Sequence, residues 1–199
     1  MKLTRVWAMP NAATFQIKPI QQLLARYVGT GKGWIDPFAG RNSPAELTND
    51  INRKIPATFH LDALKFVEGL TTNPKGILFD PPYSIRQVSE HYQSAGRKAS
   101  QLDTSANFYS RVMNAVCDNV QEWAISFGWN TNGFGVNRGF EIVEILIVAH
   151  GGRHNDTLCV VEKRTTKQDQ QRRAQERQER LDRQFQQPLT KEELAELLS

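Results

Sequence analysis

Short apolar runs alternate with helix-like segments along the first 164 residues, and this alternation constrains the fold more than any other feature. Residues 33–38, 45–50 and 75–83 each combine a few apolar residues with flanking turn residues, as strands do. Residues 20–28 and 61–70 carry apolar side chains at helical spacing instead. Strands that alternate with helices are typical of an α/β domain, so we predict a largely parallel sheet.

Three more strands are predicted in the second half of this region. Residues 104–120 first predict a helix that begins at Thr104 or Ser105, and residues 122–129 a strand after it. Residues 140–150 and 157–164 are strand-like and are joined by the turn-rich "GGRHND". We therefore expect an antiparallel hairpin at one edge of the sheet.

The composition changes near Thr165. The following segment has almost no core residues and no glycine, and Glu, Gln and Arg dominate it. Glu176 and Arg180, like Glu179 and Arg183, form acidic-to-basic pairs four residues apart, which favours a solvated helix. The sequence thus predicts a domain over residues 1–164 and a charged helical tail over residues 165–199.

A short amphipathic helix is predicted near the end of the tail. It follows Pro188, and Thr190 with Glu193 has the spacing of a capping box. Its apolar positions offer a surface for a homodimer through the C-terminal helices: Leu189, Leu194, Leu197 and Leu198. The alternative interpretations of the tail are a helix that is merely solvated, or one whose arginines help to hold nucleic acid.

Charge and cysteine usage narrow the class of protein. The net charge of +4 lies entirely in residues 1–164, because the tail carries seven basic and seven acidic residues, and it favours an anionic partner such as nucleic acid. Cys117 and Cys159 lack the spacing of metal ligands, so we expect no metal site and no disulfide framework. No apolar run approaches the ~20 residues of a membrane span. We expect a cytoplasmic protein of a bacterial or phage-infected cell.

Acidic residues follow the predicted strands at the point where each one ends. Asp36, Asp50 and Asp80 stand directly after apolar runs, and Asp62 begins a helix after a short strand around residues 58–60. In open α/β sheets, ligands bind in the crevice outside the carboxyl ends of the strands. One such aspartate is usually a turn or cap residue. Four together favour a site for a ligand that bears hydroxyl and amino groups.

The ordered motifs "DPFAG", "TNDIN", "HLDAL" and "FDPPY" resemble those of S-adenosylmethionine-dependent amino-methyltransferases of DNA. More narrowly, the chain looks like the small DNA adenine methyltransferases of phages and mobile elements, over roughly residues 3–164. The resemblance implies a Rossmann-like class I methyltransferase fold with a C-terminal antiparallel hairpin. It also implies S-adenosylmethionine as cofactor and duplex DNA with a flipped target base as partner.

Eight residues are implied by this resemblance to bind the cofactor. They are Phe15 and Lys18 near its methionine end, Asp36, Pro37, Phe38 and Gly40 in the loop after the first strand of the motif set, and Asp50 and Asp62. In the family the acid matching Asp50 bonds the ribose hydroxyls, and the acid matching Asp62 bonds the adenine amine.

The tetrapeptide from Asp80 to Tyr83 carries the implied chemistry. An exocyclic amine is a poor nucleophile because its lone pair is delocalised into the ring, and acceptors on its two protons pull the nitrogen towards tetrahedral geometry. By this resemblance, we expect Asp80 to supply one acceptor and the carbonyl of Pro81 the other. Pro81 and Pro82 would stiffen the backbone and hold this carbonyl in a set direction. Tyr83 is expected to stack on a base that has left the duplex.

Two segments are candidates to contact the nucleic acid. Residues 84–103 contain Arg86, Arg97 and Lys98, which are suited to phosphate contacts, although an ordinary surface loop is the alternative. Trp129 and Asn130 precede a glycine-rich stretch and are candidates to line the base pocket, where a plain turn is the alternative.

The cofactor loop departs from the family pattern. It has Asn42 where the family usually has a second glycine, and the connection from Asp36 to the next strand is too short for an ordinary crossover helix, which we expect to be reduced to a turn. Methylation of a cytosine amine or of RNA adenine stays open as an alternative. So do a non-catalytic nucleic-acid-binding module that retained the fold and an assembly protein that uses the tail.

Overall fold

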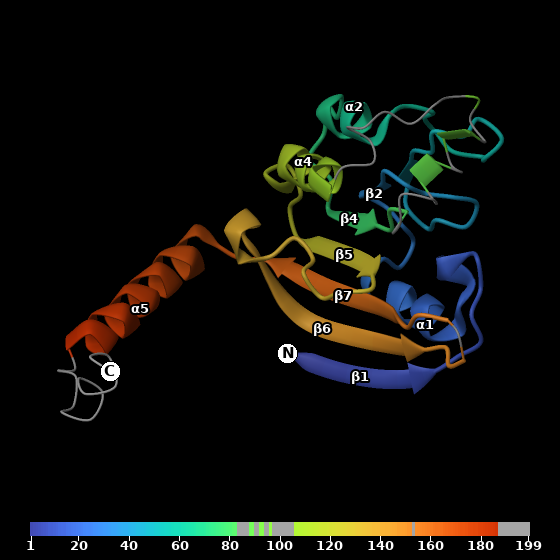
Figure 1. Ribbon diagram of the computed structural model, residues 1–199. Helices are drawn as coiled ribbons and strands as arrows, with labels where there is room; N and C mark the ends of the chain where they lie inside the picture. The colour runs from blue at the N-terminus through green and yellow to red at the C-terminus, as the bar shows by residue number, and fades with distance from the viewer. Residues whose placement is uncertain (83–87, 90–91, 94–95, 97–105, 153, 187–199) are drawn as a thin grey trace, which may run out of the picture. The chain divides into compact units, whose positions relative to one another are not determined.

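The computed structural model describes residues 1–82, 88–89, 92–93, 96, 106–152 and 154–186 (Figure 1). The chain divides into two compact units, Met1–Arg164 and Thr165–Ser199. The first unit holds a sheet with helices on both faces, and the helix α5 (Lys167–Gln186) belongs to the second. Within the described ranges, no helix has the length and apolar character that crossing a membrane requires.

Seven strands form one sheet in the order β1-β6-β7-β5-β4-β2-β3. In chain order they are β1 (Lys2–Trp7), β2 (Trp34–Asp36), β3 (Leu47–Thr48), β4 (Gly76–Phe79), β5 (Trp123–Gly128), β6 (Phe140–Ala149) and β7 (Thr157–Arg164). Among the strands of the described residues, only β7 runs antiparallel to its neighbours, β5 and β6. The predicted α/β class, with a mostly parallel, Rossmann-like sheet and a C-terminal antiparallel hairpin, is confirmed.

The strand order reverses between β2 and β4. From β2 the chain proceeds outward to β3, and it then returns to the other side of β2 for β4 and β5. Beyond β3, the short strand predicted around residues 58–60 is present as an isolated parallel bridge between Asn49 and Phe59. In open α/β sheets a reversal of this kind opens a crevice at the carboxyl ends of the strands.

The predicted place of the hairpin at one edge of the sheet is wrong, because β1 covers β6. These strands pair in parallel from Lys2 opposite Glu144 to Trp7 opposite Ala149. Glu144 is buried on β6 and binds Lys2 at 3.1 Å and Arg26 of the helix α1 (Lys18–Tyr27) at 2.7 Å, so β1, β6 and α1 are joined through one carboxylate. Burial raises the pKa of Glu144, but the hydrogen bonds from Tyr27, Lys2 and Arg26 and the charge of Arg26 outweigh it, so the pKa lies below its ordinary value.

The predicted helices begin and end within a few residues of their expected bounds, as α1 (Lys18–Tyr27), α2 (Ala63–Glu68), α4 (Ala106–Cys117) and α5. The described residues also contain two short 3-10 helices that were not predicted, η1 (Thr14–Gln16) and η2 (Val136–Arg138). Pro19 occupies the first turn of α1, where its missing N–H costs nothing. The connection of β2 to β3 has turns and no helix, as predicted from its length. The predicted cap at Thr104 or Ser105 lies outside the described residues.

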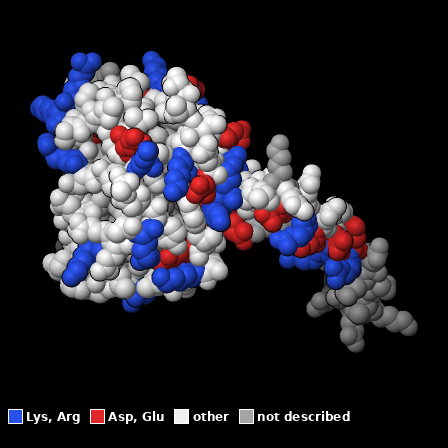
Figure 2. Space-filling model, turned by 180° about the vertical axis from the view of Figure 1, so that it is seen from behind, with Lys and Arg blue, Asp and Glu red and all other residues white. Residues whose placement is uncertain are grey.

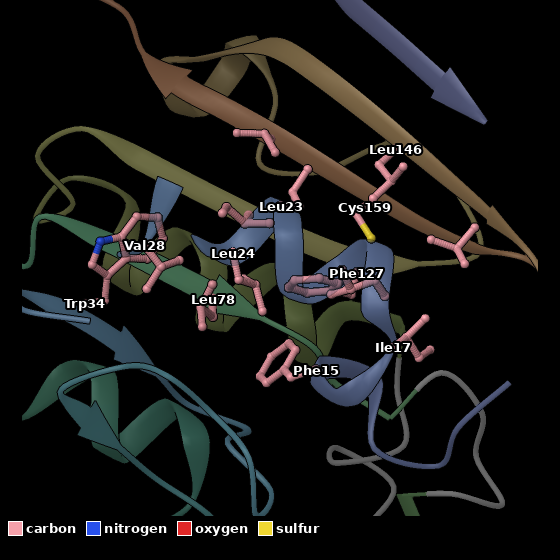
Figure 3. Packing of buried hydrophobic residues seen from close by; sticks show 14 residues of the cluster. Phe15, Ile17, Leu23, Leu24, Val28, Trp34, Leu78, Phe127, Leu146 and Cys159 are labelled. Atoms are coloured by element: carbon pink, nitrogen blue, oxygen red, sulfur yellow. The ribbon is translucent and has the colours of Figure 1, made fainter. Parts of the chain in front are cut away.

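Two apolar clusters pack on opposite faces of the sheet, because alternate residues of a strand point to opposite sides. On β4, Leu78 belongs to the first cluster, and Ile77 and Phe79 belong to the second. Figure 3 shows the first cluster, in which Leu23 and Leu24 of α1 lie over the sheet with other buried side chains. The second cluster packs α2 and α4 against the other face.

In the second unit, α5 has the features of a solvated helix. Thr166 precedes it, and its Oγ1 accepts a hydrogen bond from the N–H of Asp169 at 3.1 Å and donates to the Asp169 carboxylate at 2.7 Å. The predicted pair of Glu179 and Arg183 is present at 3.7 Å, and Glu176 binds Arg172 at 3.9 Å. The predicted amphipathic helix, with its capping box, lies outside the described residues.

Hydrogen bonds to a buried carboxylate hold the glycine-rich loop after β5 against β7. Glu162 of β7 is fully buried and accepts hydrogen bonds from the N–H groups of Phe134 and Gly135, both at 2.7 Å. Gly133 has a φ of +53°, and a Cβ at this position would lie 2.3 Å from Glu162 Oε2. The approach of this loop to β7 therefore requires glycine.

We expect Gly133→Ala to lower the free energy of unfolding by roughly 3 kcal/mol, because it adds a clash with a buried carboxylate to the backbone strain. Gly152→Ala is the matched control, since Gly152 also has a positive φ of +61° but no atom within 4 Å of its Cβ position. The control should lose only about 1 kcal/mol, the cost of the left-handed backbone alone. Urea denaturation of both variants measures the difference, and equal losses would contradict the role of the contact.

Candidate functional site

A cavity of about 410 Å³ lies at the carboxyl ends of β2, β3 and β4, where the strand order reverses. Its wall is built from distant parts of the chain: residues 12–15, the loops 37–42 and 49–55, residues 80–82 and the beginning of α4. Parallel strands bring these segments together because their carboxyl ends meet at the same edge of the sheet.

Eight of the predicted site residues line this one cavity. They are Phe15, Pro37, Phe38, Gly40 and Asp50 from the predicted cofactor set, and Asp80, Pro81 and Pro82 from the predicted catalytic set. The remaining catalytic residue, Tyr83, and the predicted nucleic-acid contacts Arg86, Arg97 and Lys98 lie outside the described residues.

Asp50 and Gly40 form a polar corner of the cavity. The Asp50 carboxylate accepts hydrogen bonds from the N–H groups of Gly40 at 3.2 Å and Asn52 at 2.7 Å. Gly40 has a φ of +55°, and a Cβ at this position would meet no atom within 4 Å. The corner thus combines a fixed carboxylate, whose oxygens have further lone pairs, with a backbone that a ligand can approach closely.

Asp36 is fully buried, and its carboxylate organises the loop that follows it. Oδ1 accepts a hydrogen bond from the N–H of Phe38 at 2.9 Å, and Oδ2 accepts one from the hydroxyl of Ser43 at 2.6 Å. Asp36 therefore shapes the wall of the cavity from behind, through residues 37–43.

The pKa of Asp36 is raised to about 7, chiefly because burial disfavours the charged carboxylate. The hydrogen bonds from Ser43 and Phe38 lower the pKa, and the nearby carboxylates of Asp80 and Asp50 raise it. The site therefore concentrates acidic groups, and a cationic ligand would relieve their repulsion.

Asn49 is a structural residue of the site that the sequence analysis did not single out. It is 1% exposed, and its amide nitrogen donates to the carbonyls of Pro37 and Leu61, both at 3.1 Å. Its amide oxygen accepts from the N–H of Leu61 at 2.9 Å. One side chain thus joins the loops that follow β2 and β3 to the segment before α2. The only signal in the sequence is its place directly before Asp50.

Asp62 caps α2, with Oδ1 accepting a hydrogen bond from the N–H of Leu64 at 3.0 Å. Its other oxygen accepts one from the hydroxyl of Tyr92, a residue of the cavity wall, at 3.1 Å.

The two residues predicted near the methionine end of the cofactor differ in burial. Lys18 begins α1 with an exposed side chain. Phe15 is buried and packs edge-on against Phe127, with ring centroids 5.1 Å apart.

The residues after β4 form the opposite wall of the cavity. Asp80 is half-buried and Pro81 is buried, directly after Phe79. The ring of Phe79 packs edge-to-face against Phe38 at 5.3 Å. The wall that carries Asp80 is thereby packed against the loop that carries Gly40.

Trp129 and Asn130 lie at the carboxyl end of β5, the strand next to β4. Trp129 is 49% exposed, and the Asn130 side chain accepts a hydrogen bond from the N–H of Asn132 at 3.0 Å, which forms a turn.

In the described part of the chain, no cluster of three or more His, Cys, Asp or Glu side chains could hold a metal ion.

No protein-family model matches the sequence, and no curated protein matches it either. Among solved structures, the chain is similar to magnesium protoporphyrin IX methyltransferase from Synechocystis PCC 6803 with bound SAM. That match has a TM-score of 0.47 and 13% identity and covers 74% of this chain and 79% of that one. The chain is also similar to a candidate methyltransferase from Escherichia coli, with a TM-score of 0.45 and 12% identity over 75% of this chain and 86% of that one.

We expect Asp36→Asn to change how stability depends on pH. The folded carboxyl has a pKa of about 7 against an ordinary value of 3.8, so its contribution to stability is fully present below pH 3.8 and is lost as the pH rises through 7. Asparagine keeps the shape of the side chain and does not titrate. The free energy of unfolding of the variant should therefore rise relative to that of the natural chain as the pH increases through this interval, by at most about 4 kcal/mol. Urea unfolding of the ligand-free proteins at about pH 4 and about pH 8 measures this gain. Parallel pH dependence of the two proteins would contradict it.

Asn49→Ala should lower the free energy of unfolding by about 3 kcal/mol, because it leaves buried backbone groups of Pro37 and Leu61 without their partner. Asn130→Ala serves as the control, since its amide lies in an exposed turn and its loss should stay within about 0.5 kcal/mol. Denaturant titration of both variants provides the comparison. Similar losses would mean that the loops hold together without the Asn49 amide.

Proposed function

We propose that the protein transfers a methyl group from S-adenosylmethionine to the exocyclic 6-amino group of adenine in DNA. The observation that carries the proposal is the shared cavity, which has Phe38, Gly40 and Asp50 on one wall and Asp80 and Pro81 on the other. A donor and an acceptor of a methyl group must meet in one space, as this arrangement allows. The volume of about 410 Å³ also lies in the range usual for ligand pockets.

The residues present fit this cofactor. The Asp50 carboxylate is suited to accept hydrogen bonds from a pair of ribose hydroxyls, and Gly40 leaves space beside it. Ile51 and Ile55 also line the cavity and are suited to contact the flat adenine ring. The acidic surroundings favour a ligand with a positive charge. When bound, the cofactor supplies a methyl group activated on a sulfonium sulfur.

Asp80 and Pro81 would act on the amine of the substrate. The Asp80 carboxylate and the Pro81 carbonyl each accept a hydrogen bond from one amine proton, which frees the nitrogen lone pair for attack on the methyl carbon. The new carbon–nitrogen bond would replace the carbon–sulfur bond, whose electron pair would stay on sulfur, and the proton lost by the nitrogen would pass to water. These residues contribute through position and preset electrostatics. Tyr83 would stack on the base.

The surface charge supports a polyanionic substrate. Lys and Arg outnumber Asp and Glu on the face of the first unit seen in Figure 2. Arg41, Arg53 and Lys54 are exposed on the two loops that border the cavity. The hydrogen bond between Gly40 and Asp50 joins these loops. Phosphate contacts from such cations and stacking on the exposed Trp129 would hold a nucleic acid across this edge of the sheet.

The proposal predicts that the purified protein, given S-adenosylmethionine, produces methylated adenine in unmethylated DNA. Asp80→Ala should lower the rate by at least about 100-fold, as the loss of one preset hydrogen bond to the reacting group does elsewhere. Nucleoside mass spectrometry of duplex DNA, single-stranded DNA and RNA after the reaction measures base and polymer together.

Cofactor binding provides the control for this experiment. Asp80→Ala should keep the thermal shift that S-adenosylmethionine causes, and Asp50→Ala should lose it. Methylated cytosine, or methylation of RNA alone, would overturn the assigned substrate and leave the reaction class standing. A cofactor-induced shift without product on any polymer would favour a binding module. No shift at all would overturn the proposed function.

A further inference from the structure

Tyr109 of α4 holds the backbone of the Asp80–Pro82 wall. Its hydroxyl donates a hydrogen bond of 2.7 Å to the carbonyl of Pro82. Tyr109 is half-buried and lines the same cavity as Asp80 and Pro81. Helix α4 thereby makes a polar contact with the segment on which the proposed chemistry depends.

The ring of Tyr109 is fixed by aromatic neighbours from three elements. Its centroid lies 5.9 Å from Phe38 in the loop after β2, 6.3 Å from Phe79 at the end of β4, and 5.6 Å from Phe108 of α4. The interplanar angles of 80°, 89° and 67° are those of edge-to-face packing. A ring held on several sides leaves its hydroxyl little freedom to leave Pro82.

The chemical state of Tyr109 is also defined. Burial raises the pKa of Tyr109 above its ordinary value of 10.0, so the phenol keeps its proton at any working pH. Tyr109 therefore serves as a hydrogen-bond donor and not as a base.

The hydrogen bond acts on a backbone torsion that the proline rings leave free. The rings fix φ at Pro81 and at Pro82, and neither residue has an N–H that could hold it to a neighbour. The ψ torsion of Pro81 is narrowed by the proline that follows it, whereas the ψ torsion of Pro82 sets the direction of the Pro82 carbonyl. By holding that carbonyl, Tyr109 fixes the end of the segment that carries the Pro81 carbonyl, the second acceptor in the proposed reaction.

We propose that Tyr109 is a positioning residue for methyl transfer, which acts through the Pro82 peptide to hold the Pro81 carbonyl in the direction that the substrate amine requires. The inference rests on the proposed function. It assigns Tyr109 no contact with the reacting atoms, so its loss should affect turnover and leave cofactor binding intact.

The test compares Tyr109→Phe with a matched control, Tyr27→Phe. Tyr27 also lies on a helix, and its hydroxyl donates a hydrogen bond of 2.8 Å to Glu144. It packs with the first cluster, on the opposite face of the sheet from Tyr109. Each variant loses one oxygen atom and one hydrogen bond.

We expect Tyr109→Phe to lower kcat by about 10- to 100-fold, the effect of a small misplacement of groups around a reacting centre. Its KM for S-adenosylmethionine, its cofactor-induced thermal shift and its pH profile should match those of the natural protein. Tyr27→Phe should lower the melting temperature and keep kcat within about twofold, because the site lies on other elements.

Three outcomes would overturn the inference. A Tyr109→Phe protein with the natural kcat would reduce Tyr109 to structural support, while the proposed function would stand. Equal losses of kcat in both variants would show a general effect of stability. If the natural protein transfers no methyl group to any nucleic acid, the proposed function fails, and this inference fails with it.

Discussion

The hydrogen bonds at the carboxyl ends of β2 and β3 are the constraint on which the site depends. Two strands of three and two residues cannot by themselves hold the long loops that follow them. The buried Asp36 carboxylate closes one loop on itself, and the buried Asn49 amide joins it to its neighbours. Because both polar side chains lie out of water, each would be costly to leave without partners, and this fixes the loops in one arrangement.

The fold followed from the sequence wherever local pattern and tertiary environment agree. The apolar runs before Asp36 and Asp80 are buried strands, and the helical spacing of residues 20–28 gave α1 within two residues. The first strand was missed because "KLTRVW" has only two half-buried positions and gains its place by pairing with β6. That pairing also moved the hairpin away from the edge. Pairing between strands so far apart in the sequence can hardly be predicted from the local residue pattern.

The charged residues of the site could be predicted from the sequence, but the residues that hold its loops in place could not. Strand-end acids and consecutive prolines are visible in a sequence, and Asp50, Asp80 and Pro81 do line one cavity. A sequence does not show which way a strand-end side chain points, and the carboxylate of Asp36 is buried behind the loop. Asn49 and Tyr109 were missed for a related reason. Each acts through backbone groups 12 or more positions away along the chain, such as the carbonyls of Pro37 and Pro82.

The parallel pairing of β1 with β6 has a consequence for how the chain folds. It joins Lys2 to Glu144, residues 142 positions apart, so one edge of the sheet closes only through a contact of very high sequence separation. Contacts of this kind slow folding, because the entropy of loop closure is lost before the contact stabilises anything. During synthesis from the N-terminus, β1 emerges long before β6, with its exposed Leu3 and Trp7, and pairs with β6 only after residue 149 has been made. Until then it is an unpaired strand, and the nascent chain is most exposed to aggregation in that interval.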